Sequence, residues 1–373
     1  MDGRNMNVER YRDPSLFTGL LEKAIPVLEH ACESMGRKIR IMEVCGTHTV
    51  SFSKSGVRQV LSDFVELTSG PGCPVCVTDQ TDLDGMISMG KKQETIVATY
   101  GDMMKVPGTH SSLYAERAKG ADVRMVHSAA QAVQLAKDYP SKEVVFLSVG
   151  FETTAPATAL VVMQASKEKV KNFSVYSAHK CTPPALEALI QDGHQIDGFL
   201  LPGHVSVIIG RKGWSFLEKH DHPAVIGGFE PLDLLASIYL LVQEMGKSRR
   251  QVVNHYPRMV KEEGNLRAQR VLAQVFTTED VRWRGFGVLP ESGLELAPAY
   301  AAFDAKCRYS LEESKSRVIQ GCRCGEVIKG KESPLDCLLF AKACTPEKPL
   351  GPCMVSSEGT CSTYYLFERE GRA

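Results

Sequence analysis

The chain has 373 residues, with 44 basic and 44 acidic side chains and hence a formal net charge of zero. This balance gives no sign of a nucleic-acid or anionic-membrane partner, and no apolar run approaches the roughly 20 residues of a membrane-spanning helix. The polar N-terminus lacks the apolar core of a signal peptide. We therefore expect a cytoplasmic protein, whose twelve cysteines favour metal or redox chemistry over a disulfide framework.

The first two thirds of the chain have the pattern of an α/β fold. Residues 14–35 predict an amphipathic helix, and residues 231–245 predict a largely buried one. Between them, short apolar runs predict buried strands at 39–44, 65–67, 95–100, 123–127, 144–149, 173–177, 198–201 and 224–228. Alternation with helices is typical of parallel strands joined by crossover helices. We expect two similar parallel-sheet α/β domains, over residues 36–127 and 128–245.

The last third has a different character. Its apolar periodicity fades after residue 246, and beyond Trp283 it is rich in glycine, proline and cysteine. A segment this irregular needs an additional crosslink to hold its fold, and a metal centre can supply one. We expect a small, irregular iron–sulfur cluster domain over residues 246–373, on which the N-terminal segment 1–35 could pack.

Six closely spaced cysteines near the C-terminus are the candidates for that centre. Thiolates are the usual ligands of structural zinc and of iron–sulfur clusters. The spacing is wide and lacks the paired CxxC knuckles of a zinc ribbon, which favours a cluster over zinc. Spacing alone leaves open which four of the six bind, and unligated thiols remain an alternative. The six are Cys322, Cys324, Cys337, Cys344, Cys353 and Cys361.

A second group of thiols follows two predicted strands. Cys45 comes after the first strand, with His48 three residues later, and Cys73 and Cys76 follow the second strand as a CxxC pair. In open α/β sheets, ligands bind beyond the carboxyl ends of strands. A CxxC pair can close a disulfide, and its first thiol is often acidic. Cys45 could be a metal ligand, a nucleophile with His48 as base, or a small core residue; the pair could also be half a metal site.

Polar residues follow three further strands and predict one polar cleft between two sheets. They are Asp102, Glu152 in a GFETTAP stretch, and His204 in PGHVS. Each alone is a weak signal, because a glutamate at a strand end usually caps a helix or turn. The glycines match no phosphate-binding loop, so nucleotide binding is not supported.

Longer motifs give the chain a family resemblance over nearly its whole length. They are MEVCGTHT at 42–49, SGPGCPVC at 69–76, GDMMKVPG at 101–108, GFETTAPATA at 150–159, PGHVSVIIG at 202–210 and MVSSEGTC at 354–361. In this order they resemble the HypD family, the maturation factors of nickel–iron hydrogenases. The resemblance implies two related α/β domains and a third domain that carries a 4Fe–4S cluster.

The resemblance also implies roles for single residues. Cys45 would ligate a mononuclear iron together with a cysteine of the small protein HypC, with His48 close to that iron. Cys73 and Cys76 would be a redox-active thiol pair beside it, and Glu358 would lie beside the cluster. The implied cluster ligands are Cys324, Cys337, Cys344 and Cys361, which leaves out Cys322 and Cys353.

For function, the resemblance implies a hydrogenase maturation factor. With HypC it would form the scaffold on which iron acquires two cyanides and one carbon monoxide, the cyanide coming from HypE. We expect a redox-active assembly scaffold instead of a conventional enzyme, and a monomer that forms transient complexes. The alternatives are a cluster-dependent disulfide reductase that uses Cys73 and Cys76, and a zinc-stapled binding protein.

Overall fold

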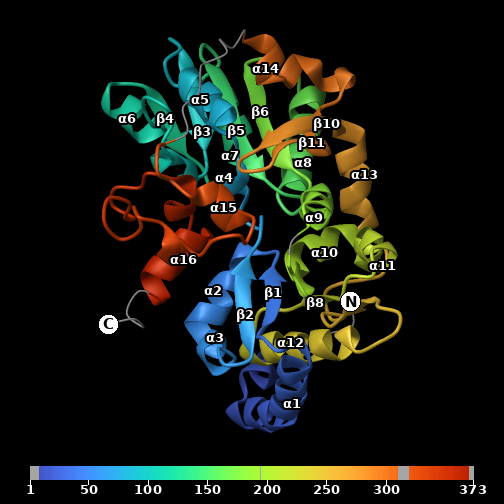
Figure 1. Cartoon of the computed structure of the whole chain (residues 1–373). Helices are drawn as coiled ribbons and strands as arrows, with labels where there is room; N and C mark the ends of the chain where they lie inside the picture. The colour runs from blue at the N-terminus through green and yellow to red at the C-terminus, as the bar shows by residue number, and fades with distance from the viewer. Residues whose placement is uncertain (1–7, 194, 310–318, 369–373) are drawn as a thin grey trace.

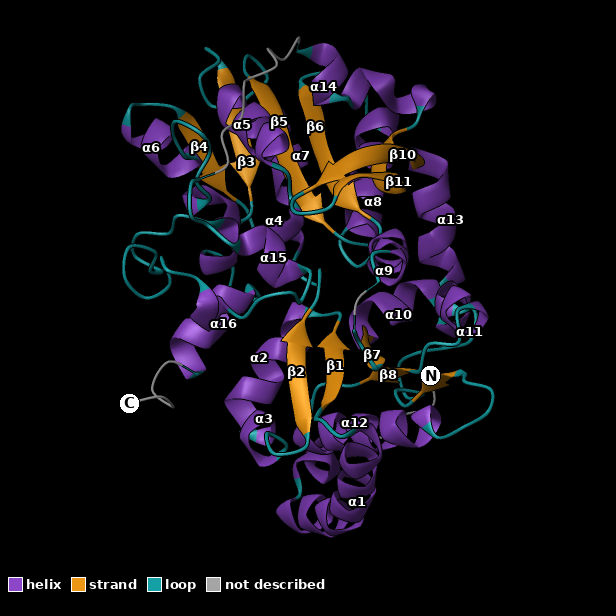
Figure 2. Ribbon diagram, in the orientation of Figure 1, coloured by secondary structure: helices purple, strands orange, loops and turns teal. Residues whose placement is uncertain are grey.

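The computed structural model describes residues 8–193, 195–309 and 319–368. Figure 1 shows two sheets, one above the other, with the red C-terminal segment alongside both. Figure 2 shows the same division, because the strands form two separate groups while the C-terminal segment consists mostly of loops and short helices. No helix in the described ranges has the length and apolar character needed to span a membrane.

The five-stranded sheet is entirely parallel, in the order β2-β1-β7-β8-β9. Helix α1 packs against α12, and both contribute leucines to the core on this face of the sheet. Asp13 caps α1 by accepting a hydrogen bond from the Ser15 N–H. The strands are β1 (Ile39–Glu43), β2 (Val65–Ser69), β7 (Gly198–Pro202), β8 (Ala224–Gly227) and β9 (Val252–Asn254). The helices of this half are η1 (Val8–Arg12), α1 (Pro14–Met35), α2 (Gly46–Ser55), α3 (Val57–Val60), α10 (Gly203–Ile209), η3 (Arg211–Trp214), α11 (Phe216–Lys219) and α12 (Pro231–Met245).

The six-stranded sheet has the order β10-β11-β6-β5-β3-β4, in which β3 to β6 are parallel and β10 and β11 form an antiparallel hairpin. Its strands are β3 (Thr95–Thr99), β4 (Asp122–Met125), β5 (Glu143–Gly150), β6 (Phe173–Lys180), β10 (Phe276–Trp283) and β11 (Gly287–Leu296). Its helices are α4 (Pro74–Val77), α5 (Gln80–Met89), η2 (Gly101–Lys105), α6 (Leu113–Ala118), α7 (Ala129–Asp138), α8 (Ala155–Lys167), α9 (Thr182–Gln191), α13 (Leu266–Val275), η4 (Pro298–Phe303) and α14 (Ala305–Arg308).

All eight strands expected from the sequence are present, so the α/β class with parallel-dominated sheets is confirmed. Their distribution between the sheets needs correction. The expected domains 36–127 and 128–245 do not match the topology, because β1 and β2 pair with β7 and β8 while β3 and β4 join β5 and β6. The reason is that buried parallel strands are apolar on both faces, so their sequences do not encode which neighbour each one pairs with.

The expected third domain also needs correction. Within residues 246–373, β9 completes the five-stranded sheet and the β10–β11 hairpin extends the six-stranded one. The irregular part is confined to residues 319–368, which we call the cysteine-rich lobe. It contains α15 (Cys324–Ile328), η5 (Pro334–Asp336), η6 (Pro352–Met354) and α16 (Thr360–Phe367). The N-terminal helix packs on α12 and β1, so it belongs to the five-stranded layer and not to the lobe.

Candidate functional site

The loops after β1 and β2 meet at Cys45. Cys45 adopts an extended backbone immediately before α2, and the Gly46 N–H donates a hydrogen bond to the Gly72 carbonyl at 3.2 Å. A Cβ atom on Gly72 would lie 2.5 Å from the Cys45 Cα. Only glycine therefore allows the GPGC loop to approach the Cys45 backbone this closely.

The cysteine-rich lobe closes the other side of Cys45. Thr47 Oγ1 donates to Glu358 Oε1 at 2.7 Å, and a Cβ on Gly46 would lie 2.4 Å from the Glu358 carbonyl oxygen. The Cys45 thiol is buried. Burial raises its pKa to about 11, and the nearby Glu358 carboxylate adds to this shift. Cys45 is therefore protonated at neutral pH until something replaces its proton.

His48 is fully buried and is held by the loop after β8. A ring nitrogen lies 3.0 Å from the Gly228 carbonyl; because a carbonyl can only accept, His48 Nε2 carries the proton. Burial lowers the pKa of His48 to about 3, which keeps the ring neutral. Its ring stacks on Phe229, and His204 also stacks on Phe229. The bond to Gly228 thus leaves the lone pair on Nδ1, which is buried and has no hydrogen-bond partner among the described residues.

The CxxC pair lies on a segment that contacts both the Cys45 loop and the cysteine-rich lobe. Cys73 immediately precedes α4 and Cys76 lies within it; both are buried and joined by a disulfide. The helix α4 packs against α15 and η6 of the cysteine-rich lobe, while α16 of the lobe packs against α2, which begins beside Cys45. The helix that carries the pair therefore packs on the lobe, and the loop before it contacts the Cys45 backbone.

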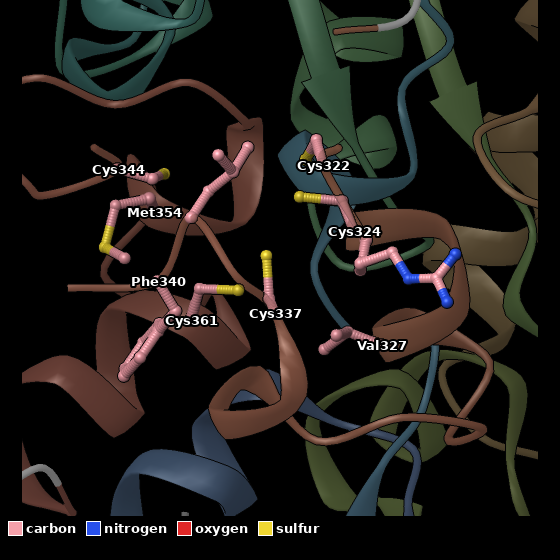
Figure 3. Close-up of a pocket in the computed structure, with 10 residues that line it drawn as sticks. Cys322, Cys324, Val327, Cys337, Phe340, Cys344, Met354 and Cys361 are labelled. Atoms are coloured by element: carbon pink, nitrogen blue, oxygen red, sulfur yellow. The ribbon is translucent and has the colours of Figure 1, made fainter. Parts of the chain in front are cut away.

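Five thiols of the lobe line one pocket, whose walls include Val327, Leu339, Phe340 and Met354. In Figure 3 the sulfurs of Cys324, Cys337 and Cys361 point into the space between them. The Leu350 N–H donates to Cys344 Sγ at 3.3 Å. A Cβ on Gly351 would lie 2.6 Å from Cys324 Sγ and 2.9 Å from Cys322 Sγ. The five cysteines are Cys322, Cys324, Cys337, Cys344 and Cys361.

The donor set of this pocket fits an iron–sulfur cluster. It combines several thiols, an apolar wall and a backbone N–H on a sulfur, and hydrogen bonds of that kind help to set a cluster's reduction potential. Hydrogen bonds with Cys324 and Cys353 lower the pKa of Cys361 to about 6. Within the described ranges, no three His, Cys, Asp or Glu side chains are arranged to hold one metal ion. A cubane cluster places each thiolate on a different iron, so its ligands stand further apart than those of a single ion.

Two of the six candidate cysteines were left out of the ligand set that the resemblance implies, and the structure places both near it. Cys322 lines the pocket beside the four implied ligands. Cys353 is fully buried and forms side-chain hydrogen bonds with Cys324 and Cys361. The close approach of Gly351 to two sulfurs has no signature in the sequence, because it depends on how the loop folds.

The other polar strand ends divide between two roles. Asp102 accepts a hydrogen bond from Ser356 Oγ at 3.0 Å, which links the loop after β3 to the cysteine-rich lobe. Glu152 instead caps α9 by accepting from the Thr182 N–H at 2.7 Å and its Oγ1 at 2.9 Å. Burial raises the pKa of Glu152 to about 7. Asp102 therefore contributes to the arrangement around the lobe, whereas Glu152 serves the ordinary role of a helix cap.

Comparisons with known proteins agree with this arrangement of motifs. A family model named HypD, described as the hydrogenase formation hypA family, matches residues 20–368. The chain is 41% identical to the hydrogenase maturation factor HypD2 of Bradyrhizobium diazoefficiens, with 97% of this chain and 96% of that protein covered. It is 41% identical to the hydrogenase maturation factor HypD of Escherichia coli (97% and 98% covered). It is 44% identical to the hydrogenase expression/formation protein HupD of Azotobacter chroococcum (90% and 91% covered). The chain therefore belongs to the HypD family of hydrogenase formation and maturation factors.

Proposed function

We propose that this protein is a redox-active scaffold that holds an iron ion on the Cys45 thiolate while the iron receives cyanide and carbon monoxide. The observation that carries the proposal is the meeting of three thiol-bearing segments at one place. Gly72 lies against the Cys45 backbone, Gly46 lies against Glu358, and α4 lies against α15. Membership of a hydrogenase maturation family supports an assembly role for this convergence.

Cys45 has the properties that such cargo requires. A soft thiolate suits iron that must also carry cyanide and carbon monoxide, and burial keeps water away from the bound ion. Because the free thiol keeps its proton, iron must displace that proton as it binds. The hydrogen bond from Thr47 to Glu358 fixes a carboxylate close to the thiol, where it can add to the attraction for a cation.

We further propose that Cys324, Cys337, Cys344 and Cys361 hold a 4Fe–4S cluster, with Cys322 as a neighbouring fifth thiol. When bound, the cluster would supply electrons one at a time. The partners in this proposal are HypC, which would share the iron through its own cysteine, and HypE, which would donate cyanide. The protein would act as a monomer that forms transient complexes with them in the cytoplasm.

An infrared spectrum of the protein, purified without oxygen together with HypC, tests the scaffold proposal. Metal-bound cyanide and carbon monoxide absorb where protein groups do not. We expect bands from both ligands in the wild type and their loss in Cys45→Ala, with the acid-labile sulfide of the cluster unchanged. A spectrum without these bands, recorded on iron-loaded complex with an intact cluster, would overturn the scaffold proposal.

A disulfide reductase is the second candidate function, favoured by the disulfide that joins Cys73 and Cys76. In that case the cluster would serve the pair, and Cys45 would be dispensable. Turnover of a disulfide substrate by Cys45→Ala at the wild-type rate, combined with a blank infrared spectrum, would favour the reductase. Zinc in place of iron and sulfide on metal analysis would contradict both functions.

A further inference from the structure

The tip of the β10–β11 hairpin, residues 283–287, lies between the disulfide and the cysteine-rich lobe. On one side it pairs with the chain just after Cys76: Trp283 forms a β-bridge with Thr78, and the Arg284 N–H donates to the Val77 carbonyl at 2.9 Å. The hairpin comes from a part of the chain far from the CxxC motif, so this contact depends on the fold. It fixes the position of the segment that leaves α4.

The Arg284 side chain strengthens this contact. Its Nε donates to the Thr78 carbonyl at 3.2 Å, and one of its terminal nitrogens donates to Gln80 Oε1 at 3.0 Å. Both acceptors are neutral, and none of the hydrogen bonds recorded for Arg284 in the described chain goes to a carboxylate. An arginine keeps its charge at every accessible pH. Arg284 therefore places a positive charge, with neutral hydrogen-bond acceptors, against the backbone just after Cys76.

The same tip touches the lobe on its other side. Gly285 has a φ of +84°, and a Cβ there would lie 2.8 Å from the carbonyl oxygen of Gly325, the residue after Cys324. In Figure 1 the orange hairpin accordingly ends beside α15. The hairpin tip therefore contacts both the segment just after Cys76 and the backbone just after Cys324.

We propose that Arg284 is a positioning residue for the Cys73–Cys76 pair, holding α4 against the lobe and favouring the reduced pair with its positive charge. This inference rests on the redox role of the pair in the proposed function. Reduction of the disulfide takes up two electrons and two protons and breaks the S–S bond to give two thiols. A nearby cation stabilises whichever thiol then ionises, so it shifts the equilibrium toward the reduced form.

Thiol–disulfide equilibrium of the full-length protein tests the inference. Dithiothreitol supplies the two electrons and two protons and closes into its own cyclic disulfide, and alkylation followed by mass spectrometry reports the reduced fraction of Cys73 and Cys76. We expect Arg284→Gln to shift the equilibrium constant about tenfold toward the disulfide, which is about 30 mV for a two-electron couple. Arg284→Lys keeps the charge and should stay close to the wild type.

Matched variants separate the charge from simple loss of structure. Arg282→Gln removes an exposed charge from the same hairpin and should leave the equilibrium unchanged. Gln80→Glu places a carboxylate on the guanidinium without altering the hairpin, and should shift the equilibrium in the same direction as Arg284→Gln even if that variant folds poorly. Wild-type values in both Arg284→Gln and Gln80→Glu, or equal shifts in Arg284→Lys and Arg284→Gln, would overturn the inference. A wild-type pair that forms no reversible disulfide would instead contradict its redox role in the proposed function.

Discussion

The Cys45 site and the pocket of the cysteine-rich lobe are built in opposite ways. Cys45 lies at the end of a buried parallel strand, where hydrogen-bonded backbone and two glycine contacts fix it. The lobe has only short helices, and five of its cysteines line one pocket. One site thus takes its geometry from a folded sheet, whereas the proposed cluster would be needed to hold the other together.

Removing one thiol from the lobe should have the largest effect. Structural metal centres contribute on the order of 10 kcal/mol to the folding of small domains, so Cys361→Ser should leave the lobe locally unfolded. Hydrogen exchange should then rise sharply over residues 319–368 and stay unchanged in β1 and β5.

The matched control is Cys307→Ser, because this exposed thiol donates to Asp304 and serine can do the same. It should keep both the lobe and the acid-labile sulfide. Equal protection from exchange in the wild type and in Cys361→Ser would show that the lobe folds without a metal centre, so the two sites would not differ in this way.

Gly72→Ala should damage the Cys45 site while sparing the lobe. The added methyl group would lie 2.5 Å from the Cys45 Cα, where backbone must move to admit it. Overpacking of this kind costs about 1–3 kcal/mol, which denaturant unfolding can measure together with the loss of iron-bound infrared bands. Gly19→Ala is the control: nothing lies within 4 Å of that position, and alanine in a helix should be stabilising by about 0.5–1 kcal/mol. An undiminished stability in Gly72→Ala would contradict the close contact.

Iron binding at Cys45 should strengthen as the pH rises, because the buried thiol must lose its proton. Its pKa of about 11 means that one proton leaves when iron binds at neutral pH. The apparent affinity should therefore rise about tenfold for each pH unit, or about 1.4 kcal/mol, up to that pKa. Competition with a chelator between pH 6.5 and 8.5 measures the slope, once the chelator's own protonation is corrected. A flat profile would mean that Cys45 is already a thiolate or that it does not bind the iron.

The sequence predicts the positions of the strands better than their partners. The apolar runs at 39–44 and 144–149 correspond to β1 and β5 because burial demands apolar residues wherever a strand lies. The parallel pairing of β1 with β7 cannot be read from their sequences, because other buried strands have the same apolar character. The thiols were visible as motifs, yet the glycine contacts that bring Cys45, Glu358 and the CxxC loop together exist only in the folded chain. For the same reason, only the folded chain shows that Cys322 lies in one pocket with the four implied ligands.

Ser356→Ala should have the smallest effect and would show how firmly the two sites are joined. Its hydroxyl donates a hydrogen bond to Asp102 and accepts one from the Glu358 N–H. The variant should therefore lose about 1 kcal/mol of unfolding free energy. That loss falls on the contact between the lobe and the loop after β3, and hydrogen exchange should rise slightly there while iron and sulfide contents stay constant. Ser357→Ala removes the neighbouring exposed hydroxyl and should change nothing. If Ser356→Ala loosened the Cys45 loop as much as Gly72→Ala does, the strand-end site would depend on the lobe, and the two would form one cooperative unit.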